Sequence, residues 1–216
     1  MTLKEELLAF YSGLKDRVPG DILETMLGAT AELRTSGIQD NALREGSLAP
    51  DFVLPGADGS AVRLSELLRN GPALLVFYRG AWCPYCNFEL RAYQQVLTQI
   101  KAKGASLVAI SPQLPHGSLT MQQKNKLEFP VLSDVGSKVA RSFGLTFELS
   151  PRLQKVYRGF GNDLTKINGS EDWVLPIPAT YVIASDFRIA KAHVDVDYTV
   201  RMEPQEALDA LAKLQH

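Results

Sequence analysis

The chain has 216 residues, of which 45% are hydrophobic and 22% charged, so it can bury the core of a full domain and does not have the composition of a disordered protein. A formal net charge of −1, without a stripe dense in Lys and Arg, argues against a nucleic-acid partner. No apolar run approaches the roughly 18 residues of a membrane span, and charged residues occupy the place where a signal peptide needs its apolar region. We therefore expect a cytoplasmic protein with no membrane contact.

Residues 1–46 predict two helices and a polar linker. Thr2 and Glu5 have the spacing of a capping box, and apolar residues follow them at helical intervals. A second helix is expected between Asp21, as its cap, and Gly37, as its terminator. We predict that the two helices form a hairpin. It is either an extra layer packed on the main domain, the interpretation that we favour, or an arm that makes a homodimer.

Residues 47–216 predict one α/β domain, because short apolar runs alternate with amphipathic stretches. The order strand, helix, strand around the middle of the chain predicts a parallel pair with a right-handed crossover. Residues 145–176 give the least regular pattern. The expected elements are short strands within 49–55 and 62–65, strands at 73–78 and 107–110, an extended segment at 129–132, helices at 84–102, 115–126 and 137–143, a strand hairpin at 180–184 and 189–194, and a helix at 204–214.

The two cysteines, Cys83 and Cys86, lie where an apolar run meets an amphipathic one. Residues 73–78 are short enough for a buried strand, and from Pro84 onward apolar residues recur at spacings of three and four. Pro84 suits the first position of a helix, which makes Cys83 its N-cap. A thiolate there meets unpaired N–H groups and the positive end of the helix dipole, so its pKa falls.

This Cys-x-x-Cys pair is best explained by redox chemistry. A structural disulfide would close so small a loop that it adds only about 2 kcal/mol. Zinc usually requires four ligands, and no histidine pair stands near the cysteines with a suitable spacing. We therefore predict a reversible disulfide between Cys83 and Cys86, and expect neither a metal nor a cofactor.

Four stretches after residue 46 carry a family resemblance. They are Ala49-Pro50-Asp51-Phe52 with Leu64-Ser65; Phe77-Tyr78 with Cys86-x-x-Glu89; Ala109-Ile110-Ser111-Pro112 with residues 129–134 and 140–144; and Ala179-Thr180-Tyr181-Val182-Ile183. In this order they resemble the peroxiredoxin family, the alkyl hydroperoxide reductase/thiol-specific antioxidant group. The resemblance implies a thioredoxin-like fold, with helices on a central mixed sheet. It also implies a hydroperoxide substrate and recycling by a thioredoxin- or glutaredoxin-type reductant.

Two departures from that family bear on mechanism. Cys83 stands where the family has a Thr, three residues before the peroxidatic cysteine that Cys86 matches, and Pro178 stands where it has an Arg beside a late strand. With both replacements, the chain resembles thioredoxins and glutaredoxins at these positions. That resemblance implies a cis Ile177–Pro178 bond packed beside the two cysteines. Without the Thr and the Arg, we expect slower reaction with hydrogen peroxide than in a typical family member.

The order of the two thiols has two interpretations. The peroxiredoxin register implies that Cys86 attacks the peroxide and that Cys83 then closes the disulfide, and this order is our prediction. Thioredoxin chemistry implies instead that Cys83, at an exposed N-cap, attacks first. Alternative functions are therefore a thiol-disulfide oxidoreductase acting on protein disulfides, and a redox sensor or interaction protein.

Three further residues are candidates for supporting the site. Arg79 either supplies the positive charge that the missing Arg would give or faces solvent at a strand end. Glu89 either orients polar groups near the thiol or is an exposed acid on a helix surface. Trp82 is expected to form a wall of the site.

Overall fold

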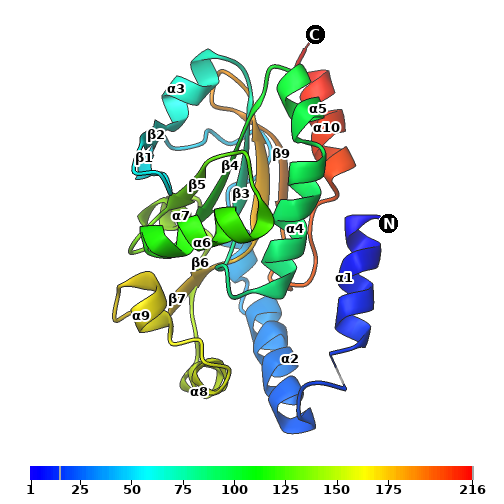
Figure 1. Ribbon diagram of the computed structural model, residues 1–216, viewed down its shortest axis with the longest axis vertical. Helices are drawn as coiled ribbons and strands as arrows, with labels where there is room; N and C mark the ends of the chain where they lie inside the picture. Colours follow the sequence, from blue (N-terminus) through cyan, green and yellow to red (C-terminus); the bar gives the residue numbers. More distant parts are fainter. Residues whose placement is uncertain (15, 216) are drawn as a thin grey trace.

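A five-stranded mixed sheet forms the centre of the computed structural model, which describes residues 1–14 and 16–215 (Figure 1). The strand order is β5-β4-β3-β8-β9. The strands are β3 (Ala73–Phe77), β4 (Ser106–Ser111), β5 (Val131–Ser133), β8 (Ala179–Ile183) and β9 (Ile189–Val194). β4 runs parallel to β3 and β5, whereas β8 is antiparallel to both of its neighbours. The predicted parallel pair, the late hairpin and the α/β class are confirmed.

Alternate residues of β3 face two separate cores, as expected for a strand that is covered on both sides. Leu74 and Val76 pack with the helices α4 (Pro84–Gln95), α5 (Leu97–Ala102), α6 (Pro115–Asn125) and α10 (Pro204–Lys213). Leu75 and Phe77 pack with α3 (Leu64–Arg69) and α7 (Lys138–Ser142). Helices therefore cover both faces of the sheet, and the cysteines lie in the first of these cores.

The helix expected over 84–102 is divided into α4 and α5, because Val96 (φ −104°, ψ 8°) is the C-cap of one and the N-cap of the other. The two short strands predicted before α3 are β1 (Val53–Pro55) and β2 (Ala61–Arg63), an antiparallel pair outside the main sheet. Each segment thus keeps the predicted type, while its bounds shift by a few residues.

The stretch 145–176, which gave no clear pattern, contains four short elements around a small core of its own. The elements are β6 (Thr146–Glu148), α8 (Pro151–Gly159), α9 (Leu164–Asn168) and β7 (Val174–Pro176). Leu153, Tyr157, Trp173 and other apolar side chains form that core. It lies beside the cysteine loop, because Trp82 packs against it.

The N-terminal helices are α1 (Leu3–Ser12) and α2 (Gly20–Thr35), and a 3-10 turn, η1 (Ile38–Asn41), follows them. The predicted capping box of Thr2 and Glu5 is present. Asp21 is not the cap of α2, since Pro19 holds that position and Asp21 lies in the first turn. The hairpin prediction is also wrong, because α1 packs on α4 and α2 packs beside α8, and the two helices diverge in Figure 1.

The N-terminal helices nevertheless form a packed layer, as favoured. Leu3 and Leu7 of α1 are buried in the same core as the cysteines, and Met26 and Ala29 of α2 pack against the core around Tyr157. The division of the chain at residue 46 stays a prediction. None of the helices in the described part of the chain combines the length and the apolar character needed to cross a bilayer.

Candidate active site

Cys83 and Cys86 lie at the start of α4, directly after the loop that leaves β3. Cys83 is the N-cap (φ −85°, ψ 115°) and Pro84 opens the helix, as predicted. Both thiols are free, and Cys83 is 1% and Cys86 0% exposed. The expectation of an exposed thiol at the N-cap is therefore wrong, because surrounding aromatic side chains and the N-terminal helices cover the sulfur.

Polar side chains fix the cysteine loop from two sides. Asn87 donates through Nδ2 to the carbonyl oxygens of Ala81 (2.9 Å) and Cys83 (2.7 Å). Gln113 accepts from the amide N–H of Ala81 at 2.7 Å. Gly80 has φ 155°, and a Cβ there would stand 2.3 Å from the Trp82 indole nitrogen. The loop is thus held in one conformation, and it requires glycine at position 80.

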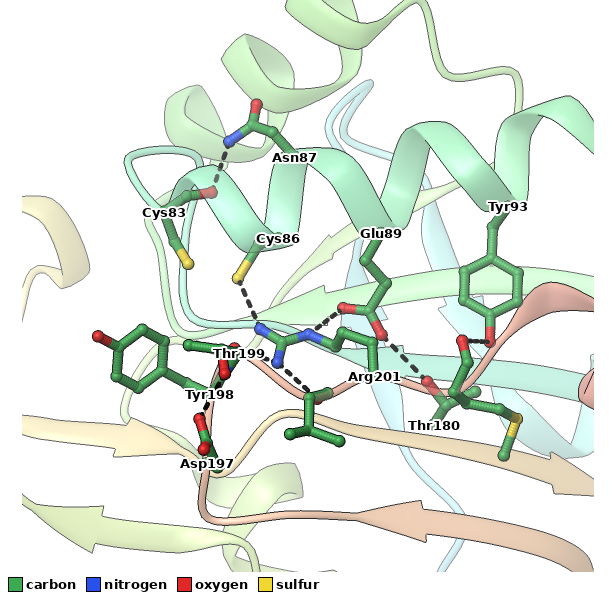
Figure 2. Close-up of polar contacts among 12 residues, drawn as sticks. Cys83, Cys86, Asn87, Glu89, Tyr93, Thr180, Asp197, Tyr198, Thr199 and Arg201 are labelled. Carbon is green, nitrogen blue, oxygen red and sulfur yellow. Dashed lines mark hydrogen bonds and ion pairs between the residues drawn. The ribbon is translucent and has the colours of Figure 1, made fainter. Parts of the chain in front are cut away.

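A buried ion pair lies against Cys86. Figure 2 shows Arg201 between the thiol and Glu89: its Nη2 is 3.7 Å from the Cys86 Sγ, and its Nε donates to Glu89 Oε2 at 2.8 Å. Thr180 donates to the other carboxylate oxygen at 3.3 Å. Arg201 also donates to the backbone oxygens of Tyr198 and Val200. Cys86 therefore faces a cation whose charge is already paired.

The sequence did not predict Arg201 as a site residue, and it left the burial of Glu89 undecided. We predicted that the site lacks an arginine because Pro178 stands where the family has one, but Arg201 contacts Cys86 from the segment between β9 and α10. Glu89 is fully buried, so the alternative of an exposed acid is wrong. A signal for Glu89 existed, since a position three residues after Cys86 and four before Tyr93 lies on the inward face of the helix.

Arg79 is 3% exposed and does not face solvent, which excludes one of its two interpretations. Its guanidinium carbon lies 4.9 Å from the ring centroid of Trp82, 5.4 Å from that of Tyr157 and 4.3 Å from that of Tyr198. Trp82 packs edge-on against Tyr157, with centroids 5.3 Å apart. Three aromatic faces therefore surround this cation, an arrangement that cation–π attraction favours.

The Ile177–Pro178 bond is trans, since no peptide bond among the described residues is cis, and the expected cis bond is wrong. The amide of Ile177 donates to the carbonyl oxygen of Leu145 at 2.7 Å, and Ala179 pairs with Phe77 of β3. The chain between these two contacts is extended and keeps the generally favoured trans form. Pro178 lines a small space of about 20 Å³ beside Arg79. It does not border the larger cavity next to Cys83.

That larger cavity has a volume of about 260 Å³ and reaches Cys83 but not Cys86. Arg79, Trp82 and Tyr85 line it beside the thiol, which places Trp82 in a wall of the site as expected. Side chains from the first 26 residues, from residues 157–162 and from Tyr198 complete the lining. A small organic molecule in this space would meet the Cys83 sulfur first.

The two thiols have opposite pKa shifts. Burial by itself raises the pKa of Cys83, but a hydrogen bond with the Cys86 thiol and the charges of Arg79 and Arg201 lower it to about 6. Burial raises the pKa of Cys86 well above its usual value, as do the hydrogen bond and the charge of Cys83, although both arginines oppose the shift. Burial also raises the pKa of Glu89 to about 7, against the charge of Arg201. Near neutral pH the negative charge of the thiol pair therefore resides on Cys83.

Comparison with known proteins places this site in a family. The model of the AhpC/TSA family matches residues 46–192, which include both cysteines. The chain belongs to the AhpC/TSA family. The match ends before Arg201 and leaves out α1 and α2.

Relatives and solved structures agree with this assignment. Peroxiredoxin Bcp of Escherichia coli is 31% identical over 119 residues, 55% of this chain and 75% of its own length. The chloroplastic peroxiredoxin Q of Triticum aestivum is 28% identical over 141 residues, 65% of this chain and 64% of its own. The crystal structure of peroxidoxin BcpB from Mycobacterium tuberculosis is similar in fold, with a TM-score of 0.63 at 24% identity over 80% of this chain and 98% of that one.

The chain is thus a peroxiredoxin-type oxidoreductase with a thioredoxin-like fold, as the sequence resemblance predicted. Family membership implies a hydroperoxide substrate and a thioredoxin-type reductant. The site described above provides two adjacent thiols for that chemistry.

Proposed function

We propose that the chain reduces organic hydroperoxides in a cycle that begins at Cys83. The cavity beside this thiol is the observation that carries the proposal, because it offers a substrate access to Cys83 and not to Cys86. The lowered pKa of Cys83 supports the same order, since the thiolate is the attacking form. This order differs from the family register, which favours Cys86.

The cycle needs two steps at sulfur. The Cys83 thiolate attacks one peroxide oxygen, the O–O bond breaks, and the alkoxide leaves and takes up a proton to become an alcohol. Cys83 is then a sulfenic acid. The Cys86 sulfur attacks the sulfenic sulfur, the S–O bond breaks, and an S–S bond forms while the hydroxyl takes up the proton of the Cys86 thiol and leaves as water. Two electrons and two protons from a dithiol reductant restore both thiols.

Arg201 and Arg79 have different tasks in this scheme. Arg201, in contact with the Cys86 sulfur, stabilises the negative charge that develops there during the second step. Arg79 lowers the pKa of Cys83 and so maintains the thiolate that begins the first. Glu89 positions Arg201 through their ion pair. Trp82 and Pro84 shape the approach to Cys83.

The reductant that fits best is a thioredoxin- or glutaredoxin-type protein in the cytoplasm. That compartment supplies such dithiols and keeps the Cys83–Cys86 pair reduced between cycles. Because both sulfurs are buried and the cavity reaches only Cys83, the reductant attacks the Cys83 sulfur of the disulfide through the entrance of that cavity.

Trapping the sulfenic acid tests the order of attack. We expect the Cys86→Ser variant, treated with cumene hydroperoxide and dimedone, to carry the label on Cys83 and to keep most of the wild-type rate of thiol oxidation. The matched Cys83→Ser variant should lose most of that rate. Labelling of Cys86 in Cys83→Ser at the wild-type rate would restore the order that the family register implies.

A thiol-disulfide oxidoreductase is the second candidate. It is favoured by the low pKa of a thiol at a helix N-cap, which equally suits attack on a disulfide. Reduction of insulin disulfides by the protein, at a rate above its consumption of hydroperoxide, would give this function the first place.

A further inference from the structure

The cavity beside Cys83 has walls that are mainly apolar. Phe10, Leu14, Val18 and Met26 line it from α1, α2 and the segment between them, and Phe160 lines it from the end of α8. The volume of about 260 Å³ is far above the roughly 10–15 Å³ that a cavity needs to hold one water molecule. It is therefore larger than a hydrogen peroxide molecule requires, and it suits a ligand with an apolar body.

Three donor groups in the lining have no hydrogen-bond partner among residues 1–14 and 16–215. They are Arg79 Nε, Trp82 Nε1 and the Tyr85 hydroxyl, and each of these atoms is buried. Buried polar groups are generally paired, and leaving one unpaired costs about 1–3 kcal/mol. All three residues border the same cavity, although these three atoms are themselves covered by protein. An anionic ligand in the cavity would therefore meet the remaining N–H groups of the Arg79 guanidinium.

Charge distinguishes Arg79 from the other buried arginine. Arg201 pairs with Glu89, but none of the ion pairs within the described part of the chain includes Arg79. The charge of Arg79 stabilises the Cys83 thiolate, but the direct contact between an arginine and a sulfur is that of Arg201 with Cys86. A guanidinium has five N–H donors, so Arg79 can serve the thiolate and a second anion together.

We propose that this cavity binds an organic hydroperoxide that carries a carboxylate, with Arg79 as the group that recognises the carboxylate. The apolar body lies against Phe10, Leu14 and Met26, and the peroxide oxygens face Cys83. The proposal deepens the proposed function and rests on it. It assigns substrate selection largely to the N-terminal segment and to Arg79.

A matched pair of substrates tests the proposal on the full chain. The para-carboxy derivative of cumene hydroperoxide and its methyl ester differ in charge but hardly in the reacting group. We expect the acid to oxidise the reduced protein about 10- to 100-fold faster than the ester, as one charge-assisted hydrogen-bonded contact would give. The ratio is measured by stopped flow and divided by the same ratio for a free thiol.

Two variants decide which arginine carries the preference. Arg79→Gln should bring the ratio of acid to ester close to one, even though both rates fall with the loss of thiolate. Arg158→Gln is the control, because Arg158 also lies over an aromatic ring, that of Trp173, but is exposed and does not line the cavity. It should keep the wild-type ratio. Equal rates for acid and ester in the wild type, or an unchanged ratio in Arg79→Gln, would overturn the proposal.

A binding measurement separates failure of this proposal from failure of the proposed function. 4-Isopropylbenzoate has no peroxide, so its binding, measured by calorimetry against that of its methyl ester, does not depend on catalysis. Loss of benzoate binding in Arg79→Gln supports the site even if neither hydroperoxide oxidises the thiols, in which case only the proposed function fails. Absence of benzoate binding to the wild type overturns the proposal. So does a carboxylate preference that appears only in the reduction step, as faster reduction of the oxidised protein by 3-mercaptopropionate than by 2-mercaptoethanol, because the site would then recognise the reductant and not the hydroperoxide.

Discussion

Cys83 and Cys86 are three residues apart, yet the two arginines that act on them lie in different settings. On the Cys86 side, Arg201 is paired with Glu89, bonded to backbone oxygens and sealed in the core. On the Cys83 side, Arg79 has aromatic faces around it, an unpaired Nε and a cavity in front of it. The first arginine is held by the protein itself, whereas the second keeps its hydrogen-bonding capacity for something else.

This difference shows how one helix turn can separate two tasks. A cation whose partners are all internal stabilises charge on a sulfur without attracting ligands, because its donors are occupied. A cation with open donors stabilises a thiolate and also attracts anions from outside. The comparison therefore predicts that changes on the Cys86 side alter folding most, and that changes on the Cys83 side alter reactivity.

Arg201→Met should have the largest effect on stability. It leaves the buried Glu89 without its partner, which typically costs about 3–5 kcal/mol of unfolding free energy. The raised pKa of Glu89 would rise further, so above about pH 7 the native state of the variant still holds a proton that its unfolded chain has released. The loss of unfolding free energy relative to the wild type should therefore grow as the pH increases above about 7. Urea unfolding between pH 6 and 9 measures both effects.

The control for this variant is Arg44→Met. Arg44 forms an ion pair with Asp40 on the surface, with both side chains more than half exposed, so its loss should leave the unfolding midpoint unchanged. An Arg201→Met protein as stable as the wild type would show that the Cys86 side does not depend on its ion pair.

Arg79→Gln should alter reactivity more than stability. Removing the guanidinium charge removes one of the causes that lower the pKa of Cys83, so the pH midpoint of its alkylation should rise from about 6 to above about 7. Alkylation by iodoacetamide in a Cys86→Ser background reports this thiol alone, since the serine hydroxyl can still donate to Cys83. If the midpoint does not move, Arg79 is not the charge that Cys83 senses.

Phe10→Ala should have the smallest effect of the three. The Phe10 ring lies 5.2 Å from that of Tyr85 and 5.5 Å from that of Phe88, and such pairs contribute about 0.5–1.5 kcal/mol each beyond the area that they bury. We expect a loss of about 1–2 kcal/mol in urea unfolding and a weaker preference for bulky over small hydroperoxides. Leu8→Ala, on the exposed face of the same helix, should change neither.

The cysteine side of this comparison could be predicted from local sequence. A buried run, a proline and an apolar stripe specify β3, the N-cap and the inward face of α4, and each of these signals lies within a few residues of the structure that it specifies. The family resemblance likewise predicted a central mixed sheet flanked by helices. Local signals also show that Glu89 falls on the buried stripe.

The arginine side could not be predicted in the same way. Arg201 is 115 residues from Cys86, in an irregular segment, and no local pattern records that the chain returns there. Arg79 has a solvent-facing alternative until Tyr157 and Tyr198, from elsewhere in the chain, are known to cover it. The trans bond at Pro178 could not be predicted from local sequence either, because neighbouring strands determine it and the local motif does not.

The same separation of Cys86 and Arg201 along the chain sets an order of events during biosynthesis. The ribosome releases the cysteine loop, β3 and α4 long before residue 201 emerges, and domains fold as units once their sequence is available. Until then the emerging Cys86 has neither its arginine nor the completed core around it. The nascent chain therefore carries an ordinary pair of thiols until residue 201 has emerged, and only then does it gain the surroundings in which the proposed Cys83–Cys86 disulfide can close rapidly.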